Sequence, residues 1–146
     1  MPIFVDKVDQ GHCLYLQAAT PNLPTESVLR IGLVNNMPDG AFASTEQQLF
    51  DLLQAAGEGL AIRLSLYALP TITRSKSAQH YVDRFYTSID TLYCDALDGL
   101  IVTGAEPRAS QLTEEPYWSD LGKLFDWAKH GACSTMCSCL RSEERV

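Results

Sequence analysis

The chain has 146 residues, of which 46% are hydrophobic, so it is long enough for one domain with a core and short for two domains of ordinary size. Its formal net charge of −7 argues against nucleic acid and anionic membranes as partners, because both require a basic surface. The sequence shows no secretory leader and no apolar stretch of membrane-spanning length, so we expect a cytoplasmic protein whose five cysteines are free thiols.

The first part of the chain is expected to hold an arm, a strand and a helix. Residues 1–27 contain three prolines and little periodicity, which predicts an irregular N-terminal arm. The apolar run 28–36 is typical of a strand buried on both faces of a sheet. Ser44 and Gln47 have the spacing of a capping box, which predicts that Ser44 caps the helix that follows.

The later segments continue this alternation of strands and helices. Apolar residues occupy every second position of 60–67, which predicts a half-exposed strand near a sheet edge. A helix over 77–86, a buried strand over 99–104, a helix opened by Pro116 and a strand over 133–139 follow. The helix after Pro116 has a predicted apolar face made of Trp118, Leu121, Leu124, Phe125 and Ala128. We therefore predict an α/β domain over residues 28–146, with a parallel sheet covered by helices on both faces.

Three turns of this predicted sheet are candidates for a functional site. In open α/β sheets, ligands bind beyond the carboxyl ends of the strands, and three such ends carry Asn35-Asn36, Gly104 and Cys139. A thiol where a strand turns is a candidate nucleophile, and Gly104 together with the N–H after Cys139 could hold an oxyanion. Purely structural roles are the alternative: Cys139 buried in the core, Gly104 needed only for its turn, and both asparagines ending a strand.

Zinc binding is a rival interpretation of the cysteine-rich end. His130, Cys133, Cys137 and Cys139 supply plausible ligands within ten residues. An extended strand would spread the three cysteines over roughly 20 Å, which is too far for one ion. We therefore predict no metal site.

Four motifs follow one another along the chain: Asn35-Asn36-Met37-Pro38 with Thr45-Glu46, then Asp98-Gly99-Leu100-Ile101-Val102-Thr103-Gly104-Ala105, then Glu115-Pro116-Tyr117-Trp118, and Ser134-Thr135-Met136-Cys137-Ser138-Cys139. In their order and spacing, these motifs resemble the homoserine O-succinyltransferase family of acyltransferases, which act in methionine biosynthesis and share the fold of class I glutamine amidotransferases.

The resemblance implies a flavodoxin-like or class I glutamine amidotransferase-like fold and a set of site residues. Cys139 would take an acyl group from succinyl-CoA or acetyl-CoA, used as a co-substrate with no tightly bound cofactor, and pass it to the hydroxyl of homoserine. The turn Gly104-Ala105 would contribute to the oxyanion site, and Asn35 and Asn36 would contact substrate. Arg108 stands where the family borders its acyl pocket, and a guanidinium suits the carboxylate of succinyl. Its structural alternative is a solvated loop position paired with Glu106 or Glu114.

The resemblance also implies an incomplete fold. The base histidine of the family and its glutamate partner belong to a C-terminal half that these residues do not include, and 140–146 does not resemble the helix that follows the nucleophile. We expect a chain that is inactive alone and whose uncovered sheet faces promote self-association, for example as a homodimer. The alternatives are a non-catalytic binding or interaction module of the same fold, and a cysteine hydrolase or amidotransferase.

Overall fold

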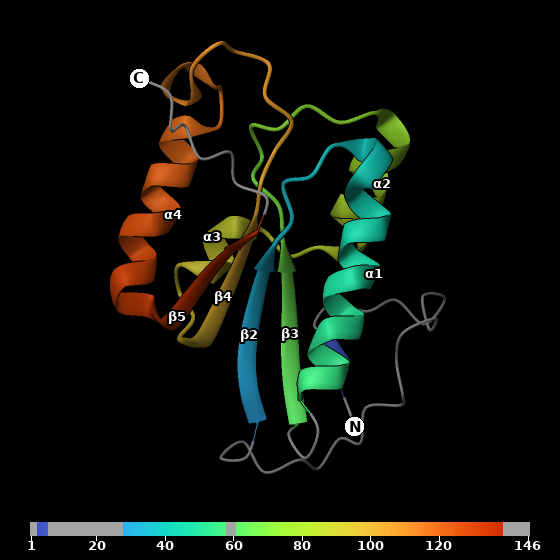
Figure 1. Cartoon of the computed structure of the whole chain (residues 1–146), viewed down its shortest axis with the longest axis vertical. Helices are drawn as coiled ribbons and strands as arrows, with labels where there is room; N and C mark the ends of the chain where they lie inside the picture. The colour runs from blue at the N-terminus through green and yellow to red at the C-terminus, as the bar shows by residue number, and fades with distance from the viewer. Residues whose placement is uncertain (1–2, 6–27, 58–60, 139–146) are drawn as a thin grey trace.

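A computed structural model describes residues 3–5, 28–57 and 61–138. Its five strands form one sheet in the order β1-β3-β2-β4-β5, and every neighbouring pair is parallel (Figure 1). The strands are β1 Ile3–Val5, β2 Val28–Val34, β3 Ala61–Tyr67, β4 Leu97–Thr103 and β5 Ala132–Ser138. The helices are α1 Asp39–Ala56, α2 Lys76–Phe85, α3 Ile89–Leu92, the 3-10 helix Leu112–Glu114 and α4 Trp118–Gly131. The α/β class predicted from the sequence is confirmed.

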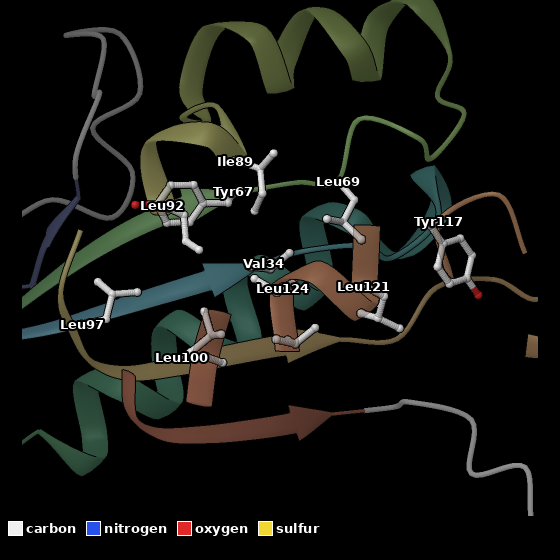
Figure 2. Packing of buried hydrophobic residues seen from close by; sticks show 12 residues of the cluster. Val34, Tyr67, Leu69, Ile89, Leu92, Leu97, Leu100, Tyr117, Leu121 and Leu124 are labelled. Carbon is white, nitrogen blue, oxygen red and sulfur yellow. The ribbon is translucent and has the colours of Figure 1, made fainter. Parts of the chain in front are cut away.

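Helices cover both faces of the sheet, and each face has its own apolar cluster. On one face α3 and α4 pack on β2, β3 and β4, with Leu100, Leu121 and Leu124 among the most buried side chains (Figure 2). On the other face α1 and α2 pack against β2, β3 and β4 through Phe42, Phe50 and their neighbours. A strand covered on both sides must be apolar on both sides, which explains the continuous apolar runs in β2 and β4.

Several details differ from the sequence prediction. Residues 3–5, within the segment expected to be irregular, form the edge strand β1. Helix α1 begins at Asp39 with Pro38 as its N-cap, so the predicted cap at Ser44 is wrong; the Ser44 hydroxyl instead donates to the carbonyl of Ala41. Pro38 has the extended backbone of an N-cap residue, and its carbonyl accepts from the N–H of Ala41, so the helix starts upstream of Ser44.

Two further predictions need correction. The second half of β3 is buried on both faces rather than half exposed, because its side chains enter the apolar clusters on both sides of the sheet, Tyr67 on one face and Leu64 and Leu66 on the other. Trp118 was placed on the apolar face of its helix, but it is 40% exposed at the first position of α4. The short helix α3 was not predicted, because four residues are too few to show a helical period.

Within the described ranges, no helix combines the length and apolarity that crossing a bilayer requires.

Candidate functional site

The carboxyl ends of the strands meet at one edge of the sheet, and direct hydrogen bonds join their turns (Figure 1). The N–H of Asn36 after β2 donates to the hydroxyl of Thr103 in β4 at 2.7 Å. The N–H of Gly104 after β4 donates to the carbonyl of Ser138 in β5, also at 2.7 Å. The turns after β2 and β4 therefore lie beside each other, and β5 lies beside β4 as far as its last residue, Ser138. Cys139 itself lies outside the described residues.

A cavity of about 250 Å³ lies at this edge, between the turns after β2, β3 and β4 and the start of α4. Three residues predicted from the sequence border it: Asn36, Ala105 and Arg108. Arg108 is exposed, and within the described part of the chain it forms no ion pair with Glu106 or Glu114. The other lining residues are Pro38, Asp39, Gly40, Thr71, Ile72, Thr73, Glu106, Glu115, Pro116 and Tyr117.

Asn35 does not line the cavity but lies beneath it, with no solvent exposure. Its amide nitrogen is within 3.2 Å of the Phe42 carbonyl and 3.3 Å of the Tyr86 hydroxyl, and its amide oxygen accepts from the Met37 N–H. In this conformation the side chain presents no group to a ligand, so its role is to hold the turn. The Asn36 oxygen accepts from the Leu69 N–H, which links the turn to the end of β3.

Behind Asn35 lies the buried side chain of Glu46, which the sequence marks only as part of a motif. Glu46 is 6% exposed and accepts hydrogen bonds from the hydroxyls of Tyr81 at 2.8 Å and Tyr86 at 3.1 Å. Burial, with the charge of Glu46 as a second cause, raises the pKa of Tyr86 well above its ordinary value. The phenol therefore stays protonated and keeps donating, which rigidifies the support under the site.

Arg74 is a residue that sequence reasoning missed. It follows β3, its side chain is 1% exposed, and its guanidinium donates to the carbonyls of Met37 at 3.0 Å and Asn35 at 3.2 Å. It lies over the ring of Phe42 at 4.3 Å and 3.5 Å from the Asp39 carboxylate. The Ser75 N–H, which also donates to Asp39, is the main cause that lowers the pKa of that carboxyl. Arg74 thus fastens the turn after β2 to the turn after β3.

Glu115 was also missed as an individual site residue, although its motif was noted. It is 5% exposed, and its Oε1 accepts from the N–H groups of Arg108 at 2.8 Å and Ala109 at 2.9 Å. Its Oε2 is buried and has no hydrogen-bond partner. Burial, and secondarily this carboxylate, raises the pKa of the neighbouring Tyr117. No local sequence period marks Glu115, because its partners lie in a loop.

The predicted oxyanion turn is only partly available in this structure. The N–H of Gly104 is committed to the carbonyl of Ser138, so within the described residues the turn offers an oxyanion the N–H of Ala105; the N–H after Cys139, the other predicted donor, lies outside those residues. The bond nevertheless places the Gly104-Ala105 turn beside the residue that precedes Cys139 in the sequence.

The described residues contain no group of three or more histidine, cysteine or acidic side chains arranged to hold a metal ion. Cys133 and Cys137 lie on the extended strand β5, the conformation on which the spacing argument rested, and Cys139 is outside the described ranges. Desolvation raises the pKa of the Cys137 thiol. His130 is exposed in the last turn of α4, whereas His80 is exposed on α2, and neither borders the 250 Å³ cavity.

A larger cavity of about 600 Å³ lies where α2, α3 and α4 face one another. Its charged lining is mainly acidic, with Asp83, Asp90 and Asp120 against Arg74 and Lys123. No residue of the turns after β2, β4 and β5 borders it. We therefore place the candidate site at the smaller cavity, where the predicted residues meet.

Comparison with known proteins identifies similar sequences. The family model described as homoserine O-succinyltransferase matches residues 8–145. The homoserine O-succinyltransferase of Rhodopseudomonas palustris is 45% identical over 82% of this chain and 36% of its own length. The homoserine O-succinyltransferase of Bradyrhizobium japonicum is 49% identical over 81% of this chain and 37% of its own length. The homoserine O-succinyltransferase of Nitrosococcus oceani is 41% identical over 77% of this chain and 31% of its own length. The chain thus spans about a third of the length of these curated relatives.

Proposed function

Because this chain belongs to the homoserine O-succinyltransferase family, we propose that it supplies the sheet, the acyl site and the nucleophile turn of an acyltransferase acting on homoserine. The observation that carries the proposal is the meeting of Asn36, Ala105 and Arg108 at one cavity beside the end of β5. The sequence singled these residues out although Asn36 and Arg108 are 72 positions apart (108 − 36).

The proposed reaction has two steps. In the first, the Cys139 thiolate attacks the thioester carbonyl of succinyl-CoA; the new S–C bond forms, the C–S bond to coenzyme A breaks, and coenzyme A leaves as its thiolate, which takes a proton from solvent. In the second, the hydroxyl of homoserine attacks this acyl-enzyme and loses its proton to a base. The C–S bond to Cys139 breaks, which frees the Cys139 thiolate and releases the succinyl ester of homoserine. The N–H of Ala105 would donate to the oxyanion formed in both steps.

Arg108 is proposed to recognise the acyl group. Its exposed side chain borders the cavity, and a guanidinium can pair bidentately with the terminal carboxylate of succinyl. Acetyl has no such carboxylate, so this pairing would discriminate between the two donors. Asn36 would form part of the cavity wall with both ends of its amide already bonded, to the Thr103 carbonyl and the Leu69 N–H, and Asn35 would support it from beneath.

We propose that residues 1–146 alone react slowly. No histidine borders the cavity within the described residues, so the base that the second step needs would come from elsewhere in the protein. A thiol without a base or cationic neighbour is mostly protonated at neutral pH, which would also slow the first step.

Intact-mass analysis after incubation with succinyl-CoA tests the nucleophile. We expect slow addition of one succinyl group, abolished by Cys139→Ser and unaffected by Cys94→Ser, whose thiol is exposed away from the cavity. Rapid labelling that depends on Cys139 would contradict the slow reaction of the chain alone. Labelling spread evenly over Cys13, Cys94 and Cys133 would deny Cys139 a special role.

The acyl preference is tested by the ratio of labelling rates with succinyl-CoA and acetyl-CoA. Arg108→Glu reverses the charge that faces the succinyl carboxylate, so we expect the ratio to fall about tenfold or more. Glu114→Arg is a charge-reversing control in the same β4–α4 connection, because Glu114 is exposed and does not border the cavity. An unchanged ratio in Arg108→Glu would remove Arg108 from the acyl site.

Self-association is proposed on the basis of β5. Among the described strands it pairs only with β4, and its residues Ser134 to Cys137 are exposed. Strand edges of this kind promote pairing between chains. Light scattering that shows a monodisperse monomer at all concentrations would contradict this proposal.

A further inference from the structure

The loop that carries Arg108 is held by the buried side chain of Glu115. Oε1 of Glu115 accepts two backbone hydrogen bonds, from Arg108 at 2.8 Å and from Ala109 at 2.9 Å. Both bonds have ordinary N–H···O lengths and end on the same oxygen atom. These two bonds therefore fix the backbone from which the Arg108 guanidinium projects.

Glu115 is itself rigidly placed. Its N–H donates to the carbonyl of Leu112, the first residue of the 3-10 helix, and its carbonyl accepts from the N–H of Trp118 at the start of α4. Its side chain is 5% exposed, which leaves it little room to take another rotamer. Glu115 therefore links the Arg108 loop to the start of α4, and α4 is packed on the sheet.

Glu115 and Arg108 also border the same cavity. The two ends of the loop have their own anchors, at the Gly104–Ser138 bond and at the Gln111–Glu114 turn. Glu115 holds the middle, next to the residue that would choose the acyl donor. The loop could keep its ends without Glu115, but Arg108 would then sample several positions.

We infer that Glu115 is a positioning residue that sets acyl-donor preference by fixing Arg108 at the cavity. This inference rests on the proposed function, because it assumes that Arg108 reads the carboxylate of succinyl. It assigns Glu115 no contact with substrate.

The first test is amide hydrogen exchange across 104–111 in the 146-residue chain. Glu115→Ala should speed exchange at Arg108 and Ala109 about tenfold or more, since both acceptor bonds are lost. Glu115→Gln retains an Oε1 acceptor and should stay close to wild type. The matched control is Glu114→Ala, which removes an exposed carboxylate bonded to the Ser110 hydroxyl. Unchanged exchange in Glu115→Ala would overturn the inference.

The second test is the ratio of Cys139 labelling rates with succinyl-CoA and acetyl-CoA. Glu115→Ala should move the ratio most of the way toward that of Arg108→Glu by slowing the succinyl reaction, with less than about twofold change for acetyl. Glu115→Gln should restore most of the wild-type ratio. A merely structural role would slow both reactions together and leave the ratio unchanged.

The outcomes separate the two proposals. If wild type labels at Cys139 and prefers succinyl, but Glu115→Ala keeps that preference, only the role of Glu115 is refuted. If neither donor labels Cys139 in wild type, the proposed function fails, and the specificity role that depends on it fails too.

Discussion

Replacing Arg74 by methionine tests whether the turns at the carboxyl edge are held together by one buried side chain. Methionine keeps an unbranched apolar stem against the Phe42 ring but removes both donors to the carbonyls of Asn35 and Met37. The substitution therefore separates the polar contribution of Arg74 from its packing.

The expected loss follows from these contacts. Each hydrogen bond from a charged donor contributes about 1.5 kcal/mol or more, and the cation over the Phe42 ring adds about 1 kcal/mol. The Asp39 pair adds little, because that carboxylate is 37% exposed and 3.5 Å away. Removing the buried charge relieves a desolvation cost of several kcal/mol, but the two carbonyls left without a donor take back most of that relief, at about 1 to 3 kcal/mol each. We expect the free energy of unfolding to fall by about 3 kcal/mol.

Urea unfolding followed by tryptophan fluorescence measures this change. With a slope of about 2 kcal/mol per molar, the midpoint should fall by about 1.5 M. Arg74→Lys keeps the charge but not the planar fork, and should lose less. Arg30→Met makes the same exchange at an exposed position of β2 and should change the free energy by less than about 0.5 kcal/mol. A loss below about 0.5 kcal/mol in Arg74→Met would refute the reasoning.

Three other predictions concern stability. Burial raises the pKa of Tyr86, so the folded state binds the phenol proton more tightly than the unfolded chain does. The stabilisation from this proton should be fully present below about pH 10, and the free energy of unfolding should fall as the pH rises toward the folded pKa. In urea titrations between about pH 10 and 11.5, the free energy of unfolding of Tyr86→Phe should fall less with pH than that of the wild type. An equally steep fall in both proteins would show that Tyr86 is not the titrating group. Gly57→Ala places a Cβ 2.8 Å from a backbone carbonyl oxygen of α1 and should lower the free energy of unfolding by about 1 to 3 kcal/mol. In Gly122→Ala the new Cβ meets nothing within 4 Å, so this variant should gain up to about 1 kcal/mol. Thermal melts measure both changes, and equal effects would contradict this reasoning. Leu124→Ala, at a fully buried position of α4, should cost about 2 to 5 kcal/mol, and Leu52→Ala, 63% exposed, less than about 0.5 kcal/mol; similar losses would place Leu124 outside the core.

The sequence by itself determined the strand and helix alternation and the layer architecture. The apolar runs 28–36 and 99–104 predict strands buried on both faces, which the structure forms as β2 and β4, and such strands need helices above and below them. The carboxyl ends of parallel strands share one edge, so the meeting of Asn36 with the turn after Thr103 also followed from the sequence pattern. The family motifs, in turn, pointed to Ala105 and Arg108 at the cavity.

The tertiary structure alone decided which polar groups are used in internal hydrogen bonds that support the site and which remain on its surface. Asn35 looked like a ligand-binding residue in the sequence, yet its amide is consumed by partners up to 51 positions away. Arg74 looked like one charge in a loop, yet it is buried between two turns, with its bonded carbonyls 37 and 39 positions away. Glu115 likewise binds backbone groups of another loop. Local periodicity reports which face of an element is apolar, whereas these roles depend on which distant carbonyl or N–H the fold brings within hydrogen-bonding distance.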